Sequence, residues 1–501
     1  MRRVYRPVGT KPRTGAMGLR SADEFRASLR DGRRLLYRGE PVADVSAHPS
    51  LRRTVDHAAG LFDHPDEGPA ALWAYRDDEL GDTVSTYFRR PVDVATLAAR
   101  GDLIEETTRR ARSTLNIVKV VGTDVLLSLE QVLSEDDSAD AAERLGRLRA
   151  YRAHCAAGDL TMAAAVTDPK GDRTLAPSAQ GDADQFLRVV DEGPEGIVVR
   201  GAKVHTTASP SANELLVIPC RAMGPDDADY ALAFAVPVAT PGLTLVCHPL
   251  VDGPDAEHPV SSRNIEVETL TIFDDVLVPW ERVFVCRHWR LAGAVAGAFA
   301  NFHRYTAISY KPPVVDLMIG AAALAADQLG ILRNGVVREK IGKLITYGEL
   351  IRCARVAAAE RGRQHAPSGL LVPDSIAANA GKYHFASGYH AAVAILQDLA
   401  GGIVVTAPGV EDLVHPEVGG LVRKYLQGRD GVDGVERWRL AELVRDLTAS
   451  EFGGYNDSVT LHGEGSMGAQ LVTAVRDYDV AGCVAYAREM LDAPLPAALV
   501  S

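Results

Sequence analysis

The 501-residue sequence has no cysteine pair in C-x-x-C spacing, and none of its apolar runs, such as LAGAVAGAFANF, is long enough to span a membrane. No apolar segment follows the basic N-terminus MRRVYRPVGTKPRTG, as a secretory signal would require. We therefore expect a cytoplasmic protein without a metal site or a membrane partner. The scattered cysteines fit reduced thiols better than a disulfide framework: Cys155, Cys220, Cys247, Cys286, Cys353 and Cys483.

An excess of basic residues is also lacking. Lys and Arg total 54 against 66 Asp and Glu, which gives a formal net charge of -12. No stretch is basic enough to follow a phosphate backbone, so a nucleic-acid partner is not expected. Hydrophobic residues make up 47% of the chain and charged residues 24%, an ordinary globular composition that can bury a large core in two or three structural units.

Three kinds of sequence follow one another along the chain, without an internal repeat. Helical patterning begins at SADEFRASLR, where Ser21 and Glu24 have capping-box spacing, and it continues to about residue 155. Short β-rich runs such as GIVVRGAKVHTTA follow, and long alanine-rich helical segments such as PPVVDLMIGAAALAADQLG come last. We predict an α+β protein with an N-terminal helical domain (residues 1–155), a β-barrel-like domain (156–285) and a C-terminal helical bundle (286–501).

Two polar segments stand out within this order. In TDPKGDR, Pro169 and Gly171 favour a turn, while Lys170 and Arg173 offer cationic donors to an anion; a solvated loop with ion pairs is the alternative. HGEGSMG has G-x-G-x-x-G spacing, but a dinucleotide-binding fold would need a preceding strand and a βαβ unit, and only a short tail follows. His384 and His390, from the alanine-rich region, are too widely spaced for a helical metal pair, which favours a structural role.

Longer segments resemble the 4-hydroxybutyryl-CoA dehydratase branch of the 4-hydroxyphenylacetate 3-hydroxylase superfamily, namely AVTDPKGDRTLAPSAQ, GIVVRGAKVHTTAS, IFDDVLVPWERVF and IGAAALAAD. The segments LRDGRRLLYRGEPVADVSAHP and KYLQGRDGVDGVERWRLAELVRDLTASEFGG are more similar to the hydroxylase branch. The resemblance spans nearly the whole chain. It implies an acyl-CoA-dehydrogenase-like fold, FAD between the β domain and the helical bundle, and a homotetramer.

The same resemblance implies which residues contact the cofactor. TDPKGDR corresponds to the family's flavin-binding loop, HTTAS to a segment with a hydroxyl near the flavin ring, and HGEGSMG to a loop that lines the flavin. The implied FAD contacts are Thr167, Lys170, Asp172, Arg173, Thr207, His462 and Gly463.

The chain departs from the dehydratase branch at its iron–sulfur ligands. That branch holds a [4Fe-4S] cluster through cysteines and one histidine, because thiolates are the usual ligands of such iron. Asn116, Val120 and Tyr310 stand at the three cysteine positions, and only His303 is kept. We therefore expect no iron–sulfur cluster.

The substrate positions match neither branch fully. Glu268 and Lys311 correspond to a substrate-side carboxylate and to the lysine after the last cluster ligand of the dehydratases, whereas their second catalytic glutamate falls on Val459. The substrate-binding arginine and tyrosine of the phenol hydroxylases lie in a segment replaced here by KVVGTD, and their histidine falls on Ala164. The substrate is therefore not identified, and a simple 4-hydroxyphenyl compound is not favoured.

Four residues are candidates for catalysis. His303, Tyr310 and Lys311 follow one another along a helical pattern in alanine-rich surroundings, with a hydrogen-bonded core histidine as the alternative for His303. Glu268 and Glu266 lie two residues apart in a strand-like pattern, and one of them is expected to face inward. A buried glutamate beside FAD would have a raised pKa and could act as a base, whereas a simple ion pair is the alternative.

The leading hypothesis is a two-component monooxygenase that receives FADH2 from a separate NAD(P)H:flavin reductase, directly or by diffusion, and oxygenates a small organic substrate through a flavin C4a-hydroperoxide. Thr207 and His303 are candidates for hydrogen bonds to N5 and the peroxide, and Glu268 or Tyr310 for orienting the substrate or moving its proton. The alternative is a cluster-free, flavin-dependent acyl-CoA dehydratase, isomerase or desaturase with Glu268 or His303 as base. A flavin-binding scaffold without activity is a third hypothesis.

Overall fold

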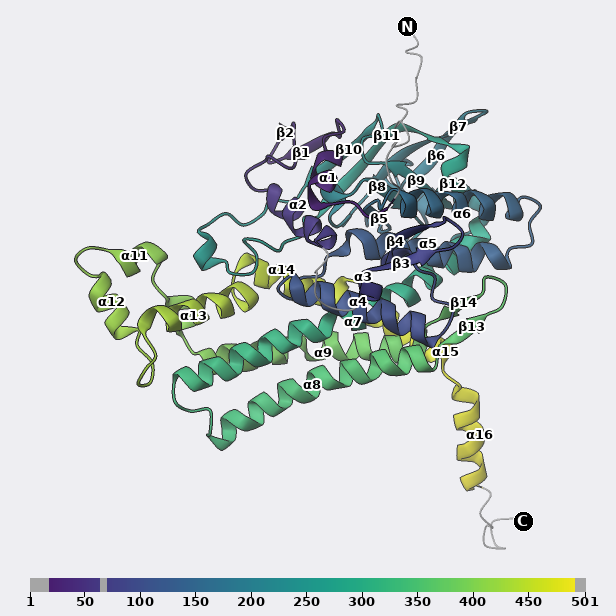
Figure 1. Ribbon diagram of the computed structural model, residues 1–501. Coiled ribbons are helices and arrows are strands. Elements are labelled where there is room, and N and C mark those ends of the chain that lie inside the picture. The colour runs from purple at the N-terminus through teal and green to yellow at the C-terminus, as the bar shows by residue number, and fades with distance from the viewer. Residues whose placement is uncertain (1–17, 64–69, 492–501) are drawn as a thin grey trace, which may run out of the picture. The chain divides into compact units, whose positions relative to one another are not determined.

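The computed structural model describes residues 18–63 and 70–491 (Figure 1). Its internal contacts divide the chain into two compact units. The first unit consists of residues 1–90, 116–250 and 266–296, and the second of residues 91–115, 251–265 and 297–501. The division into three parts made from the sequence stays a prediction. Among the described residues, no helix has the length and apolar character needed to cross a membrane.

Two sheets form the core of the first unit. The larger has the strand order β2-β1-β10-β11-β7-β6. Its strands are β1 (Leu35–Tyr37), β2 (Glu40–Val42), β6 (Arg188–Gly193), β7 (Gly196–Lys203), β10 (Leu243–Cys247) and β11 (Thr269–Pro279). All of its pairings are antiparallel except that of β1 with β10. The chain before residue 156 thus adds two strands to the sheet, which the helical pattern did not predict because three-residue strands are too short to show a period of two.

The smaller sheet has the order β12-β9-β8-β5. Its strands are β5 (Met162–Ala165), β8 (Glu214–Val217), β9 (Leu232–Pro237) and β12 (Val283–Cys286). The first three are buried on both faces, apart from the end of β9, and they are apolar except for Glu214 at the start of β8. A two-stranded sheet, β3 (Ala74–Asp77) with β4 (Asp82–Ser85), completes the β structure of this unit.

Helices cover these strands in the first unit. They are α1 (Ala22–Ser28), α2 (Arg52–Ala59), α3 (Ala70–Trp73), α5 (Ile117–Glu135) and α6 (Ala141–Ala157). The predicted capping box begins α1: the Glu24 amide donates to the Ser21 hydroxyl at 3.2 Å, and the Ser21 amide donates to the Glu24 carboxylate at 2.9 Å. Helix α5 packs against β5 and α6 and buries most of its length. Its N-terminus therefore lies inside the unit, where its free amides can serve as hydrogen-bond donors.

The second unit is a helical bundle built around α9. Its long helices are α4 (Val94–Arg110), α7 (Trp289–Gln328), α8 (Gly335–Glu360), α9 (Ser375–Ala400), α13 (Gly434–Thr448), α14 (Glu451–His462) and α15 (Met467–Asp477). Helix α9 packs against α8, α13, α14 and α15, and α7 begins in the first unit. Small residues allow the close approach of α8 and α9: a Cβ atom on Gly381 would lie 2.6 Å from the Cβ of Ala354.

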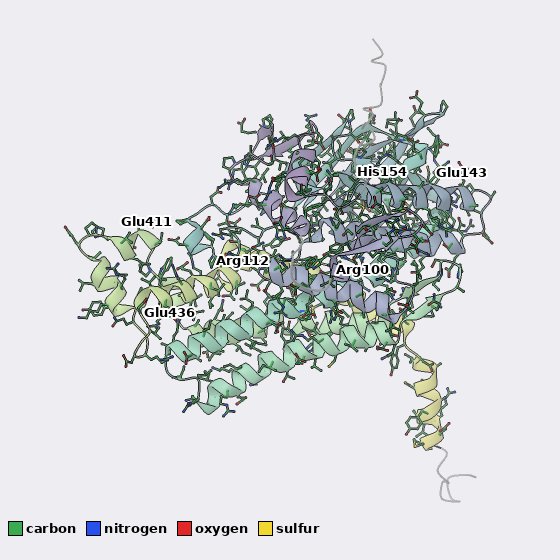
Figure 2. The ribbon with its side chains drawn as sticks, in the orientation of Figure 1. Arg100, Arg112, Glu143, His154, Glu411 and Glu436 are labelled. Carbon is green, nitrogen blue, oxygen red and sulfur yellow. The ribbon has the colours of Figure 1, made fainter. Side chains whose placement is uncertain are left out.

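Shorter elements complete this unit. They are α10 (Ile403–Thr406), α11 (Val410–Val414), α12 (Gly419–Tyr425), α16 (Val480–Leu491) and the hairpin of β13 (Arg363–His365) with β14 (Leu370–Val372). Charged residues of both units, such as Glu143, Glu411 and Glu436, lie on exposed surfaces (Figure 2).

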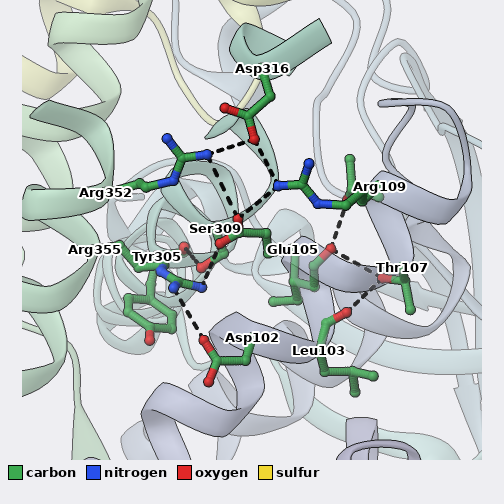
Figure 3. Close-up of polar contacts among 12 residues, drawn as sticks. Asp102, Leu103, Glu105, Thr107, Arg109, Tyr305, Ser309, Asp316, Arg352 and Arg355 are labelled. Carbon is green, nitrogen blue, oxygen red and sulfur yellow. Dashed lines mark hydrogen bonds and ion pairs between the residues drawn. The ribbon is translucent and has the colours of Figure 1, made fainter. Parts of the chain in front are cut away.

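A network of ion pairs links α4, α7 and α8 (Figure 3). Asp316 accepts from Arg109 and Arg352, both at 2.7 Å, and Arg355 pairs with Glu105 at 3.2 Å. These side chains are partly exposed, and each arginine pairs with at least one carboxylate, since Arg355 also contacts Asp102 at 3.1 Å. The network therefore fixes the helices in register without creating an unpaired buried charge.

Candidate functional site

In the first unit, Thr207 and Glu268 meet where β7 ends and β11 begins. The two strands are antiparallel, with Lys203 opposite Thr271, so the segment after β7 runs beside the segment before β11. The Thr207 hydroxyl donates to Glu268, with Oγ1 at 2.9 Å from Oε1 and 3.0 Å from Oε2. Two residues predicted separately from the sequence are thus in direct contact.

Backbone hydrogen bonds hold this contact on both sides. The amide of Thr206 donates to the carbonyl of residue 269 at 3.2 Å, and the amide of Ala208 donates to the carbonyl of residue 267 at 2.8 Å. The backbone is left-handed at His205 (φ 56°) and at Ala208 (φ 55°), conformations that cost a non-glycine residue about 1 kcal/mol or more each. A chain of buried hydroxyl groups supports the loop: Thr206, Ser209, Thr269 and Thr271.

Glu266 lies close to Glu268, and its side chain is 10% exposed. Its Oε1 accepts the amide hydrogen of Ile117, at the start of α5, at 2.8 Å and lies 3.9 Å from Nε2 of His57. Burial raises the pKa of Glu266 well above its usual value; the Ile117 amide opposes this shift, and the nearby Glu268 adds to it. The carboxyl group that resists ionisation is therefore Glu266, whereas the sequence argument had selected Glu268.

The segment TDPKGDR is anchored at its beginning. Asp168 is buried and pairs with Nζ of Lys203, at the end of β7, at 2.5 Å, and the Cys220 thiol donates to it at 3.2 Å. The carbonyl of Thr167, which is half-buried, accepts the amide hydrogen of Val204 at 2.8 Å. The sequence analysis missed Asp168 and Lys203, although both belong to segments that it selected.

The tip of the same segment is exposed. Asp172 caps the amide and hydroxyl of Thr174, and Gln180 closes the loop by hydrogen bonds to the backbone of residue 172. The side chains of Lys170 and Arg173 make no hydrogen bond or ion pair to any residue that the structure describes. The loop thus presents two unneutralised cations from a fixed base, an arrangement that suits the anionic oxygens of a cofactor such as FAD.

In the second unit, α7 carries Tyr310 and Lys311 into a buried charged cluster. Lys311 is 1% exposed, and its Nζ donates to the Tyr310 hydroxyl at 2.6 Å and lies 3.4 Å from both carboxylate oxygens of Glu464. The Tyr310 hydroxyl in turn donates to Glu464 at 2.5 Å. Lys382, from α9, is 0% exposed and lies 3.6 Å from the same carboxylate. One carboxylate is therefore shared by two buried ammonium groups and a phenol.

These contacts shift the pKa values of the cluster strongly. Burial lowers the pKa of Lys311 to about 7, because the attraction of Glu464 offsets the loss of hydration only in part. Burial alone would raise the pKa of Glu464, but Lys311 and Lys382, together with His303 and the Tyr310 hydrogen bond, outweigh it and lower that pKa to about 2. Near neutral pH the cluster thus combines a permanent carboxylate with an amine close to its own pKa.

The loop that carries Glu464 has a special backbone. Glu464 itself is left-handed (φ 54°), and so is the next residue, Gly465 (φ 93°). A Cβ atom on Gly465 would lie 2.9 Å from Nη2 of Arg304, whose Nε donates to the Glu464 carbonyl at 3.1 Å. Arg304 is also held by Asn379, at 2.8 Å, so the glycine is required for this close approach. HGEGSMG joins α14 to α15 with no preceding strand, which excludes the dinucleotide-fold interpretation.

The remaining predicted residues of this unit have different environments. His303 is buried on α7, stacks on Phe299 with ring centroids 5.0 Å apart, and lies close enough to Glu464 to lower its pKa. His462 is exposed at the end of α14, and the amide of Gly463 donates to the Val459 carbonyl at 2.7 Å. The structure therefore brings His303, Tyr310 and Lys311 to one cluster, whereas His462 and Gly463 lie on the loop beside it.

Sequence reasoning missed Lys382 and Glu464. Glu464 stands between the two glycines of HGEGSMG, which was interpreted for its glycine spacing, and the second catalytic glutamate was sought at Val459. Lys382 is a single lysine in the alanine-rich segment AANAGKYHF. A lone lysine on an apolar helical face was the available signal, since such a residue needs a buried partner.

The positions compared with iron–sulfur ligands do not offer thiolates. Asn116 donates from Nδ2 to the His57 carbonyl at 2.5 Å, Val120 is buried in the core, and Tyr310 belongs to the charged cluster. Across residues 18–63 and 70–491, no group of three or more His, Cys, Asp and Glu side chains is arranged to hold a metal ion. This donor set does not fit a cysteine-ligated cluster. The lack of a cluster stays a prediction.

Comparison with known proteins identifies the family. The 4-hydroxyphenylacetate 3-hydroxylase N-terminal domain matches residues 21–285, and the C-terminal domain of the same family matches residues 292–492. The oxygenase component of 4-hydroxyphenylacetate 3-monooxygenase from Thermus thermophilus is 34% identical over 429 residues, 84% of this chain and 86% of the relative. The 4-hydroxybutyryl-CoA dehydratase/vinylacetyl-CoA-Delta-isomerase of Clostridium aminobutyricum is 29% identical over 482 residues, 92% of this chain and 97% of the relative.

A solved structure agrees with these relatives. The oxygenase component of 4-hydroxyphenylacetate 3-monooxygenase, in complex with FAD and 4-hydroxyphenylacetate, has a TM-score of 0.87 and 30% identity, over 94% of this chain and 98% of the other. The match confirms the predicted superfamily and the acyl-CoA-dehydrogenase-like α+β fold, and it supports the expected flavin-dependent oxidoreductase. The chain belongs to the 4-hydroxyphenylacetate 3-hydroxylase family.

Proposed function

We propose that this chain is the oxygenase component of a two-component flavin monooxygenase. It binds FADH2 made by a separate NAD(P)H:flavin reductase and transfers one oxygen atom of O2 to a small organic substrate. The observation that carries the proposal is that the chain keeps the side chains suited to a flavin, Thr207 and the anchored loop of Lys170 and Arg173, while the cluster positions hold no cysteine. The 34% identity to the Thermus oxygenase component supports it.

The first unit supplies the cofactor contacts in this proposal. Lys170 and Arg173 bind anionic oxygens of FAD, Asp172 shapes the loop, and Thr167 stands at its fixed base. Thr207 places a hydroxyl at the ring edge, and His462 and Gly463 stay candidate flavin contacts on the ground of the family resemblance alone. When bound and reduced, the flavin supplies the oxygen donor, a C4a-hydroperoxide. Residues that hold it in a dry site favour transfer of oxygen over loss of peroxide.

The second unit supplies proton transfer in this proposal. Tyr310 accepts a hydrogen bond from Lys311 and donates one to Glu464, so it can relay a proton between the substrate and the lysine amine. An amine with a pKa of about 7 is close to the ideal for accepting and returning a proton at neutral pH. His303, beside the same carboxylate, is the candidate hydrogen-bond donor toward bound oxygen, and Glu268 the candidate for orienting the substrate.

A stopped-flow experiment tests the proposal. The purified protein is loaded with FADH2 without oxygen and mixed with oxygenated buffer, while the flavin spectrum is followed. We expect a transient flavin species that decays more slowly than free FADH2 reoxidises. Reoxidation at the rate of free FADH2 would count against a monooxygenase. We also expect a cytoplasmic homotetramer, for which sedimentation of the full chain gives the assembly state.

A redox-neutral reaction on an acyl thioester is the second candidate, and the cluster of Lys311 with Glu464 is the observation that favours it. The Clostridium relative is named a dehydratase and isomerase, and a buried acid–base pair suits the removal and return of a proton. The test uses FAD-loaded protein without oxygen, with 4-hydroxybutyryl-CoA as the probe. Formation of an unsaturated thioester without net flavin reduction would support this function over oxygenation.

A further inference from the structure

We propose that Glu268 is a positioning residue that makes the site prefer reduced over oxidised flavin, because it fixes the direction of the Thr207 hydroxyl group. The inference rests on the proposed function in one respect, that Thr207 contacts the N5 edge of the flavin. It concerns only which of Thr207 and Glu268, both in the first unit, donates the hydrogen bond between them. Its test requires neither oxygen nor an organic substrate.

The contact between the two residues determines which way the hydroxyl hydrogen points. Oγ1 of Thr207 lies at 2.9 and 3.0 Å from the two oxygens of Glu268, so the hydrogen is shared between both. An ionised carboxylate can only accept, and a hydroxyl has one hydrogen and two lone pairs. With its hydrogen committed to Glu268, Thr207 can offer any further partner only an acceptor.

The two redox states of a flavin differ at N5 in this respect. Reduced flavin carries a hydrogen on N5, which can donate to the Thr207 oxygen. Oxidised flavin has a bare lone pair on N5, which needs a donor. The difference of one hydrogen bond corresponds to roughly a tenfold preference in binding, since a typical net hydrogen bond changes affinity by about that factor.

Glu266 is the neighbouring carboxyl group that burial discourages from ionising. Two carboxyl groups at close range in a buried site do not both ionise readily, and Glu266 is the member whose pKa is raised by burial. The groups that face Glu266 are His57 of α2, at 3.9 Å, the amide of Ile117 at the start of α5, and Glu268 on its own segment. Burial thus favours the protonated form of Glu266, and Glu268 is the carboxylate that accepts from the Thr207 hydroxyl through both of its oxygens.

Anaerobic titrations of FAD and FADH2 test the inference. Wild type should bind FADH2 about tenfold more tightly than FAD, and Glu268→Gln should lose most of this preference, mainly through weaker binding of FADH2. The equivalent change in the midpoint potential of bound flavin is about 30 mV to more negative values. Glu195→Gln, an exposed residue between β6 and β7, removes the same charge and should leave the preference unchanged. An unchanged preference in Glu268→Gln would overturn the inference.

A double-mutant cycle keeps the test valid if Glu268→Gln binds flavin poorly for other reasons. Thr207→Val should remove the preference, Thr207→Ser should keep it, and adding Glu268→Gln to Thr207→Val should cause no further change in the ratio. A further change in the double variant would show that Glu268 acts on the flavin by another route. Normal oxygen activation by a wild type without any preference would refute this inference and leave the proposed function standing.

Discussion

Two buried glutamates, one in each unit, respond to burial in opposite ways. Within the part of the chain that the structure describes, the favourable partners of Glu266 are a backbone amide and a histidine 3.9 Å away, and burial raises its pKa. Glu464 is as deeply buried, but two ammonium groups and a phenol surround it and lower its pKa to about 2. Burial therefore does not decide whether a carboxyl group carries a proton; the number of nearby cations decides it.

The largest effect on stability should come from removing the carboxylate of Glu464. Glu464→Gln leaves Lys311 and Lys382 buried without a counter-charge, and we expect the free energy of unfolding to fall by about 3–5 kcal/mol at pH 7. Chemical denaturation measures the loss. The exposed Glu417→Gln should change stability by less than about 0.5 kcal/mol, and an equally small change at position 464 would show that the carboxylate does not neutralise the cluster.

Lys311 should make stability depend on pH in the alkaline range. Its folded pKa of about 7 lies below the ordinary lysine value, so the unfolded chain binds more protons above pH 7 and wild-type stability rises with pH there. Relative to Lys311→Met, wild type should gain about 2 kcal/mol between pH 7 and pH 9. Lys343→Met, on an exposed face of α8, should show no such slope, and a flat difference for Lys311→Met would place its pKa near normal.

Glu266 should make stability change with pH in the opposite direction, so that its contribution falls as pH rises. Its folded pKa lies above the unfolded value, so its favourable contribution is complete below about pH 4.5 and is lost as pH rises through the folded pKa. Glu266→Gln, which imitates the protonated acid, should match wild type at pH 4.5 and become increasingly more stable than wild type as pH rises to 8. Thermal unfolding across this range measures the difference, and a less stable variant at pH 8 would mean that Glu266 is ionised in the folded protein.

The smallest effect should come from the exposed network of Figure 3. Asp316→Asn breaks contacts to Arg109 and Arg352 at partly exposed positions, and we expect a loss of about 0.2–1 kcal/mol that shrinks at high salt. Denaturation at two salt concentrations tests this. A salt-independent loss as large as that for Glu464 would remove the contrast between exposed and buried ion pairs.

Local sequence patterns predicted the structure well, whereas contacts between distant segments could not be predicted from them. The capping box of Ser21 and Glu24 was predicted because both partners lie within four residues. Thr207 and Glu268 were each selected, yet their hydrogen bond depends on the register of β7 against β11, which no local pattern contains. Long β runs were likewise expected, whereas the three-residue strands β1 and β2 were not.

The charged cluster around Glu464 could not be predicted from the sequence for the same reason. Lys311 was selected by resemblance, but its partner Glu464 lies 153 residues further along the chain, and Lys382 is 78 residues from the Thr460 carbonyl that it contacts. Nothing in the spacing of these residues brings them together. Only the packing of α7, α9 and the loop after α14 does so, and the pKa of Glu266 likewise depends on the N-terminus of α5.

Infrared difference spectroscopy at neutral pH measures most directly the proton that Glu266 is proposed to carry. The spectrum of wild type minus Glu266→Gln should contain the carbonyl band of a protonated carboxylic acid, and the spectrum of wild type minus Glu464→Gln should contain only carboxylate bands. Loss of a carboxylate band, without the acid band, in Glu266→Gln would contradict the contrast between the two glutamates.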